Sequence, residues 1–219
     1  MEKITFKTID GVTITGNYFK PLKKEASVFL LLHMMPATKE SWNDFAAIIQ
    51  KNGYAALAID LRGHGESTDR NGIRLDYKEF RDEGHRSSMN DIASAMEFLA
   101  GQSDVDMSRI AIAGASIGAN LALWQASIDK DVRLIMLLSP GLNYRGIMAD
   151  ELASSFKGHV YILASEGDAK AADSSRKLVN SFPGETKMEI IKGDLHGTNM
   201  FNPEIMNRIL NWAFKRMYY

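Results

Sequence analysis

The sequence predicts an α/β protein in which a mostly parallel sheet carries helices on both of its faces. Short runs of apolar and β-branched residues, such as 26–32 and 133–138, alternate along the chain with segments of helical period. Several of these runs are apolar almost throughout, which is typical of strands buried on both faces. The chain has 219 residues, so we expect a single domain over residues 1–219.

The chain begins with the only antiparallel feature that we expect. Residues 2–9 and 12–19 alternate in character around the pair Asp10–Gly11, and an Asp-Gly pair between alternating runs predicts a hairpin. Residues 26–32 and 54–61 then form two buried strands.

Two helices are predicted in this first half of the chain. Ser41 opens the first helix, with Asp44 as its capping-box partner, and Gly53 ends it. Gly101 follows the second helix. Apolar residues at helical spacing mark both, namely Phe45, Ile48 and Ile49 in the first and Met89, Ile92, Met96 and Leu99 in the second.

The second half of the chain continues the alternation of strands and helices. Residues 117–128 form a strongly apolar helix and residues 172–182 another. In the last helix Asn202 is the N-cap and Pro203 the first position. Four further strands, at 109–113, 133–138, 159–164 and 188–192, bring the expected number to about eight.

Composition excludes several classes of function. Lys plus Arg is 26 and Asp plus Glu is 27, a net charge of −1 that argues against a nucleic-acid-binding protein. The absence of cysteine excludes disulfides, thiolate metal sites and a cysteine nucleophile. Apolar runs such as 28–32 and 134–138 have five residues, whereas a membrane-spanning helix needs about 20. With no secretory h-region after Met1 either, we expect a cytoplasmic protein with no membrane partner.

The strongest local motif is Gly114-Ala115-Ser116-Ile117-Gly118, which matches G-x-S-x-G between a predicted strand and a predicted helix. The turn between the two is so tight that only glycine fits two positions before and after the serine. Ser116 would then expose its hydroxyl at the carboxyl edge of the sheet, where helix N–H groups stabilise an oxyanion. This pattern predicts a nucleophile.

A serine hydroxyl needs a base, and the chain has five histidines. His33 ends a strand and is expected to organise a loop. His64 lies in a glycine turn, His85 in a charged stretch, and His159 at the wrong end of a strand. His196 follows the last strand and reaches the same edge of the sheet as the serine. It is therefore the predicted base.

The base in turn needs a carboxylate that fixes its tautomer. Asp168 follows the strand before the last one, 28 residues ahead of His196, and we choose it as the acid. Glu166 lies nearer the strand and is kept as the alternative. Asp173 is expected to occupy the start of the next helix instead.

The order serine, aspartate, histidine resembles that of the α/β-hydrolases, and the resemblance covers nearly the whole chain. Residues 60–67, Asp-Leu-Arg-Gly-His-Gly-Glu-Ser, resemble a D-x-R-G-H-G-x-S stretch common in esterase-like and dienelactone-hydrolase-like members. Read from its residues alone, this stretch is a glycine-bent turn whose polar residues can be structural. The resemblance implies the α/β-hydrolase fold. Only about 20 residues separate Pro140 from Val160, which leaves no room for a large cap domain.

The resemblance also implies an oxyanion hole and a cleft. By position, the backbone N–H groups of Met35 and Ile117 are the two donors, although Met34 replaces the glycine usual in relatives. Met34, Leu142 and Tyr144 are expected to line the substrate cleft. Residues 67–86, with five acidic and five basic side chains, form either a partial lid or a solvated loop.

These residues predict a serine hydrolase that cleaves small carboxylic esters through an acyl-enzyme on Ser116, with His196 as base and Asp168 as orienting acid. An acyltransferase, thioesterase or lactonase on the same triad is the alternative, and a non-enzymatic small-molecule sensor is a third hypothesis. No histidine pair has a ligand-like spacing, so we expect neither a metal nor another cofactor. The expected partner is a small ester, and the sequence indicates no oligomeric state.

Overall fold

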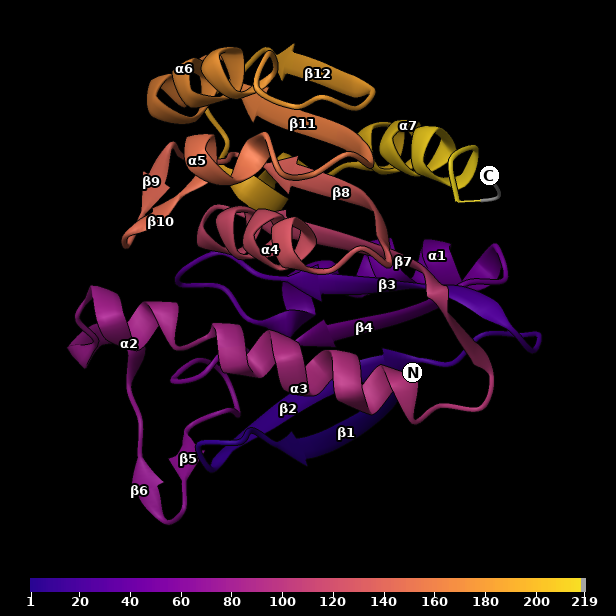
Figure 1. Cartoon of the computed structure of the whole chain (residues 1–219), viewed down its shortest axis with the longest axis vertical. Coiled ribbons are helices and arrows are strands. Elements are labelled where there is room, and N and C mark those ends of the chain that lie inside the picture. The colour runs from indigo at the N-terminus through magenta and orange to yellow at the C-terminus, as the bar shows by residue number, and fades with distance from the viewer. Residues whose placement is uncertain (218–219) are drawn as a thin grey trace.

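The computed structural model describes residues 1–217 and confirms the predicted architecture, a mostly parallel sheet between two layers of helices (Figure 1). Every one of the eight predicted strands is present. They are β1 (Glu2–Lys7), β2 (Val12–Phe19), β3 (Ala26–Leu32), β4 (Ala55–Ile59), β7 (Val105–Ala115), β8 (Val132–Leu138), β11 (His159–Ser165) and β12 (Thr186–Ile191).

The sheet follows the order β12-β11-β8-β7-β3-β4-β2, and β1 pairs with β2 as the predicted antiparallel hairpin. The six strands from β12 to β4 run parallel to one another. Two strands of two residues each, β5 (Asp69–Arg70) and β6 (Ile73–Arg74), form a hairpin that pairs with the start of β2. The carboxyl ends of the parallel strands therefore share one edge of the sheet, as predicted.

The helices form one layer on each face of the sheet, because successive strand residues point to opposite faces. On β3, Val28, Leu30 and Leu32 face one apolar core, and Phe29 and Leu31 face the other; all five are fully buried. The first core is covered by α3 (Met89–Ala100), α4 (Ile117–Ile128), α5 (Ala149–Ala153) and α6 (Ala169–Leu178). The second is covered by α1 (Asn43–Lys51) and α7 (Pro203–Phe214).

The predicted capping box of the first helix is wrong. Ser41 lies in a short 3-10 helix, η1 (Lys39–Trp42), and its hydroxyl donates to the Thr38 carbonyl at 2.8 Å. α1 begins two residues later, at Asn43, and no side chain caps it. The later start of α1 is explained by a tertiary contact, because η1 places the fully buried Trp42 in the core.

The predicted helix 172–182 begins earlier and ends earlier than expected. α6 starts directly after Asp168, because the Ala-rich residues 169–172 are strong helix formers. Asp173 therefore lies inside the helix rather than in its first turn, and it pairs with Arg176 at 2.9 Å. The cap of the last helix is confirmed, since Asn202 accepts the N–H of Ile205 at 2.9 Å and Pro203 follows it.

No cap domain interrupts the sheet. The stretch between β8 and β11 holds a small hairpin, β9 (Asn143–Tyr144) and β10 (Ile147–Met148), followed by α5. Within residues 1–217, none of the helices has the length and apolar character needed to cross a bilayer. The remaining short elements were not predicted, and they are η2 (Tyr77–Glu79), α2 (Asp82–Arg86) and η3 (Gly197–Met200).

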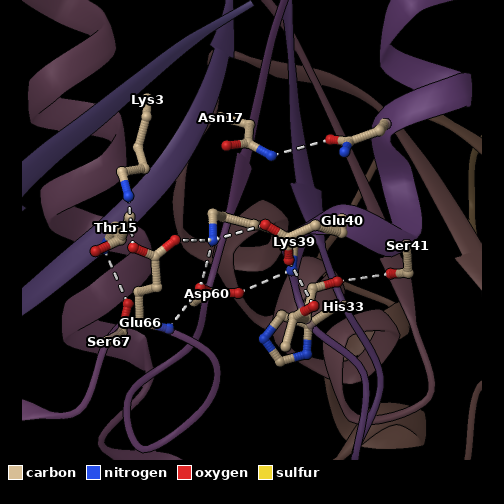
Figure 2. A network of polar contacts seen from close by, with 12 residues as sticks. Lys3, Thr15, Asn17, His33, Lys39, Glu40, Ser41, Asp60, Glu66 and Ser67 are labelled. Atoms are coloured by element: carbon tan, nitrogen blue, oxygen red, sulfur yellow. Dashed lines mark hydrogen bonds and ion pairs between the residues drawn. The ribbon is translucent and has the colours of Figure 1, made fainter.

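A buried polar network joins the loop after β3 to the loop after β4 (Figure 2). The Asp60 carboxylate accepts the Lys39 backbone N–H at 2.8 Å, the Lys39 ammonium at 2.9 Å and the Glu66 N–H at 2.9 Å. The side chains of Lys39 and Asp60 are 2% and 0% exposed. Parting the loops would leave a buried charge without its partner, which is strongly unfavourable. The network therefore keeps the two loops together.

The rest of the D-x-R-G-H-G-x-S stretch is also structural in this fold. The Arg62 guanidinium contacts the buried Asp91 carboxylate at 2.7 Å and Asp10 at 2.7 Å, which ties the turn to α3 and to the first hairpin. The Ser67 hydroxyl accepts the N–H of Thr15 at 2.9 Å. The polar side chains of this turn thus hold distant elements together.

His33 organises the loop after β3, as the sequence predicts. Its Nδ1 donates to the Met34 carbonyl at 2.9 Å, and its Nε2 accepts the Leu61 N–H at 3.0 Å. The ring is fully buried, and this burial, with the neighbouring His64, lowers the pKa of His33 to about 3. The imidazole is therefore neutral in the folded protein, since a second ring proton would face the Leu61 donor.

His33 should make folding stability depend on pH between about 6.5 and about 3. In that interval the unfolded chain takes up a proton at this histidine and the folded chain does not. The folded state thus loses up to about 1.4 kcal/mol for each unit by which the pH falls. We expect urea unfolding at a series of pH values to show a steeper loss for the wild type than for His33→Gln. Equal slopes in this interval would contradict this role of His33.

Candidate active site

Ser116 stands at a sharp turn between β7 and α4. Its backbone has φ 55° and ψ −120°, a conformation that residues other than glycine rarely adopt. The Ser116 N–H donates to the Leu138 carbonyl of β8 at 2.8 Å. The residue is 8% exposed, at the carboxyl edge of the sheet. The tertiary contacts therefore hold the serine in the strained geometry of a nucleophile elbow.

The two glycines of the motif are required by close backbone contacts. A Cβ on Gly114 would lie 2.0 Å from the Gly118 carbonyl oxygen. A Cβ on Gly118 would lie 2.4 Å from the carbonyl oxygen of Leu32, at the end of β3. These distances are far below van der Waals contact, so α4 can begin against β3 only when both positions are glycine.

His196 and Asp168 meet at the same edge of the sheet. The carboxylate of Asp168 accepts a hydrogen bond from His196 Nδ1 at 2.5 Å, although 28 residues separate them in the sequence. Asp168 immediately precedes α6, and His196 lies in the loop after β12. The carboxylate orients the imidazole, which leaves Nε2 as the ring nitrogen able to take a proton.

Backbone contacts hold these two loops together. The Gly167 N–H donates to the Gly193 carbonyl at 2.7 Å, and the Ser165 hydroxyl donates to the Leu195 carbonyl at 2.5 Å. On the far side of His196, the Gly197 N–H donates to the Ser139 hydroxyl at 3.0 Å. The position of the imidazole is thus fixed from both neighbouring loops.

The other candidates from the sequence lie elsewhere. Glu166, the alternative acid, is exposed, and its carboxylate does not reach His196. His159 begins β11 at the opposite edge of the sheet and lies 3.1 Å from Glu185. His64 is buried and stacks on Tyr77 with ring centroids 3.9 Å apart.

Met35 and Ile117 are placed where the sequence expects an oxyanion hole. Ile117 is the first residue of α4, next to Ser116, and Met35 lies in the loop after β3 that the close contact at Gly118 brings against α4. Among residues 1–217 neither backbone N–H donates to another protein group. Free N–H groups at a helix start and in a neighbouring loop are suitable donors to an oxyanion.

Tyr144, in β9, lies beside the nucleophile. Burial raises the pKa of its phenol, with a smaller contribution from the charge of Asp168, and the nearby Ser116 hydroxyl partly opposes this rise. The buried Asn120 of α4 fixes this hairpin, since its amide donates to the carbonyls of Gly141 at 2.8 Å and Ile147 at 3.0 Å. The sequence analysis expects Tyr144 to line the cleft, but no motif indicates that it lies near Ser116.

The other two expected cleft residues lie at different places. Met34 is buried, and its sulfur would meet a Cβ on Gly197 at 2.5 Å, so it packs against the loop that carries His196. Leu142 faces a separate surface cavity of about 570 Å³ beside α6, together with Lys170 and Lys177. Met34 therefore supports the histidine loop, and Leu142 borders a neighbouring depression.

Part of the segment 67–86 lies beside the loop after β3. Met35 and Pro36 of that loop line a cavity of about 450 Å³ together with the aromatic residues Tyr77 and Phe80. Sequence reasoning did not identify its residues, because the segment has no apolar periodicity.

Residues 1–217 contain no group of three or more His, Cys, Asp or Glu side chains arranged to hold a metal ion. At this edge of the sheet the protein offers a strained serine, a carboxylate-bound histidine and free backbone donors.

Comparisons with known proteins identify relatives of this chain. The chain is 29% identical over 143 residues to a polyketide transferase, claH of Penicillium crustosum, and 29% identical over 139 residues to a thiohydrolase, aneE of Aspergillus aculeatus. These matches cover 64% and 63% of this chain but only 44% and 41% of the relatives, so the chain spans less than half the length of either.

A solved structure shows the same fold over the whole chain. The dienelactone hydrolase of Anabaena variabilis superposes with a TM-score of 0.77 at 17% identity, covering 100% of this chain and 98% of that one. Residues 23–193 match the family described as serine aminopeptidase, S33. Since this match takes in most strands of the sheet together with the serine elbow and Asp168, the chain belongs to the S33 serine aminopeptidase family of α/β-hydrolases.

Proposed function

We propose that this hydrolase cleaves small carboxylic esters through an acyl-enzyme on Ser116. The observation that carries the proposal is the 2.5 Å hydrogen bond between Asp168 and His196 at the sheet edge that also holds the strained serine. A carboxylate-oriented imidazole beside such a serine is the arrangement that activates a hydroxyl for attack on an acyl carbon.

In the proposed first step, His196 Nε2 takes the hydroxyl proton while Ser116 Oγ attacks the ester carbonyl carbon. The Met35 and Ile117 N–H groups stabilise the negative charge that develops on the carbonyl oxygen. The tetrahedral intermediate then collapses, and His196 gives its proton to the departing alkoxide, which leaves as an alcohol. Water, activated by the same imidazole, hydrolyses the acyl-enzyme and regenerates the serine.

Acyl transfer, or hydrolysis of thioesters or lactones, is the second candidate. It is favoured by the names of the relatives, which are a polyketide transferase and a thiohydrolase. The same triad serves each reaction, because they differ in the leaving group or in what attacks the acyl-enzyme. Product analysis with an ester in the presence of added alcohols or thiols separates them, since a transferase yields a new ester or thioester and a hydrolase yields the free acid.

Replacing the nucleophile should abolish turnover without unfolding the protein. We expect Ser116→Ala to lower kcat for p-nitrophenyl esters by up to about a million-fold. A phosphonofluoridate probe should label the wild type at this residue. Peptide mapping by mass spectrometry locates the adduct, and Ser103→Ala, which changes an exposed serine outside the site, is the matched control. An adduct on Ser165 or Ser67, or substantial activity in the alanine variant, would contradict the assignment.

The choice of acid is tested by two substitutions that remove the same charge. Asp168→Asn should lower kcat by about ten-thousand-fold, because an amide can hold the imidazole in the wrong tautomer. Glu166→Gln should have a small effect, since the exposed Glu166 carboxylate does not touch His196. Steady-state kinetics of both purified variants provide the comparison. The reverse ranking would show that Glu166, two residues earlier, orients the base.

A further inference from the structure

The cavity of about 450 Å³ beside Met35 differs in chemistry from its surroundings. Its walls combine apolar or aromatic side chains, among them Pro36, Tyr77 and Phe80, with basic groups, and none of the lining residues is acidic. The volume falls within the range of small-molecule sites in proteins. The chamber could therefore hold a flexible substrate chain, and its charge favours an anionic end on that chain.

The position of this cavity identifies the part of an ester that it would receive. The leaving oxygen must lie next to His196, because that residue returns the proton to it. The carbonyl oxygen points toward the Met35 and Ile117 N–H groups. The acyl chain must therefore extend away from His196, past the oxyanion loop, and Met35 and Pro36 of that loop line the cavity.

His85 supplies a polar group that nothing in the protein uses. It is 3% exposed, lies in α2 and lines the cavity, with its ring edge-on to Phe80 at 5.5 Å between centroids. No hydrogen bond to its side chain is found in the described part of the chain. Burial and the nearby Arg145 charge lower its pKa, so the ring is neutral and can donate one hydrogen bond.

Two cations stand at the same cavity. Arg145, in the turn between β9 and β10, is 3.5 Å from Asp82, and both side chains are about half exposed. Exposed ion pairs of this kind are weak, so the guanidinium can exchange its partner. Lys78 also lines the cavity, and no carboxylate pairs with it within residues 1–217. Arg86 holds the turn in place by donating to the Arg145 carbonyl at 3.5 Å.

We propose that this cavity is the acyl subsite of the enzyme and that it selects acyl chains ending in a carboxylate, which Arg145, Lys78 and His85 bind. The inference rests on the proposed ester hydrolysis for its orientation. The aromatic walls hold the methylene chain, and the guanidinium and ammonium donate charge-assisted hydrogen bonds to the terminal carboxylate.

The test compares two esters that differ only at the far end of the acyl chain, p-nitrophenyl hexanoate and mono-p-nitrophenyl adipate. We expect Arg145→Gln and Lys78→Gln each to lower the ratio of kcat/KM for the adipate ester over the hexanoate ester by about tenfold or more. Arg74→Gln removes an exposed cation from the same segment, in β6 and outside the cavity, and should leave the ratio at the wild-type value. High salt should lower the wild type's ratio of kcat/KM for the adipate ester over the hexanoate ester, because dissolved ions screen the attraction between the cations and the carboxylate.

A binding measurement keeps the two proposals separate. Calorimetry with monomethyl adipate and methyl hexanoate on the Ser116→Ala protein reports the subsite without turnover, and adding Arg145→Gln should weaken binding of the adipate ester only. If p-nitrophenyl hexanoate is not hydrolysed, the proposed function fails while calorimetry still decides on the subsite. The subsite proposal would be overturned if Arg145→Gln and Lys78→Gln stayed within about twofold of Arg74→Gln. The comparison covers both the kcat/KM ratio of the two esters and the affinity for the adipate ester.

Discussion

The geometry of the site depends on one backbone contact, the approach of the Gly118 Cα to the carbonyl oxygens of Leu32 and His33. This contact sets α4 directly against the end of β3, so the loop that follows β3 lies next to the first turn of the helix. Ser116, Ile117 and the loop that carries Met35 are thereby brought together by backbone packing, to which the hydrogen bonds of the His33 ring add. Because backbone atoms are less mobile than side chains, the two proposed oxyanion donors keep their relative positions before substrate arrives.

Buried ion pairs also hold the loops around the site in fixed relative positions. The Asp60 carboxylate joins two loops through Lys39 and Glu66, and Arg62 joins a third element through Asp91. Ion pairs removed from water lose much of their attraction to the cost of desolvation, so such networks define a geometry more than they stabilise the fold. Lys39 belongs to the segment that follows the proposed oxyanion donor Met35, where a shift of a fraction of an ångström would weaken transition-state binding.

The opposite side of the site is arranged by hydrogen bonds to backbone groups. Asn120 holds the hairpin that carries Tyr144, and the contact between Gly167 and Gly193 aligns the loops of Asp168 and His196. Each of these bonds links segments that are separated by more than 20 residues. Their partners are ordinary loop residues in the sequence, which is why these contacts could not be foreseen from the pattern of residues alone.

The sequence by itself determined where the eight long strands lie along the chain, the elbow around Ser116 and the placement of Asp168 and His196 after consecutive strands. These features follow from local rules, since buried strands are apolar throughout and a tight strand-to-helix turn requires glycine. Only the tertiary structure decided where α1 and α6 begin, which side chains bind Asp60, and how residues 77–85 form a cavity with Met35. Loops of this kind have no periodic pattern, because their conformation is set by contacts with residues far away in the sequence.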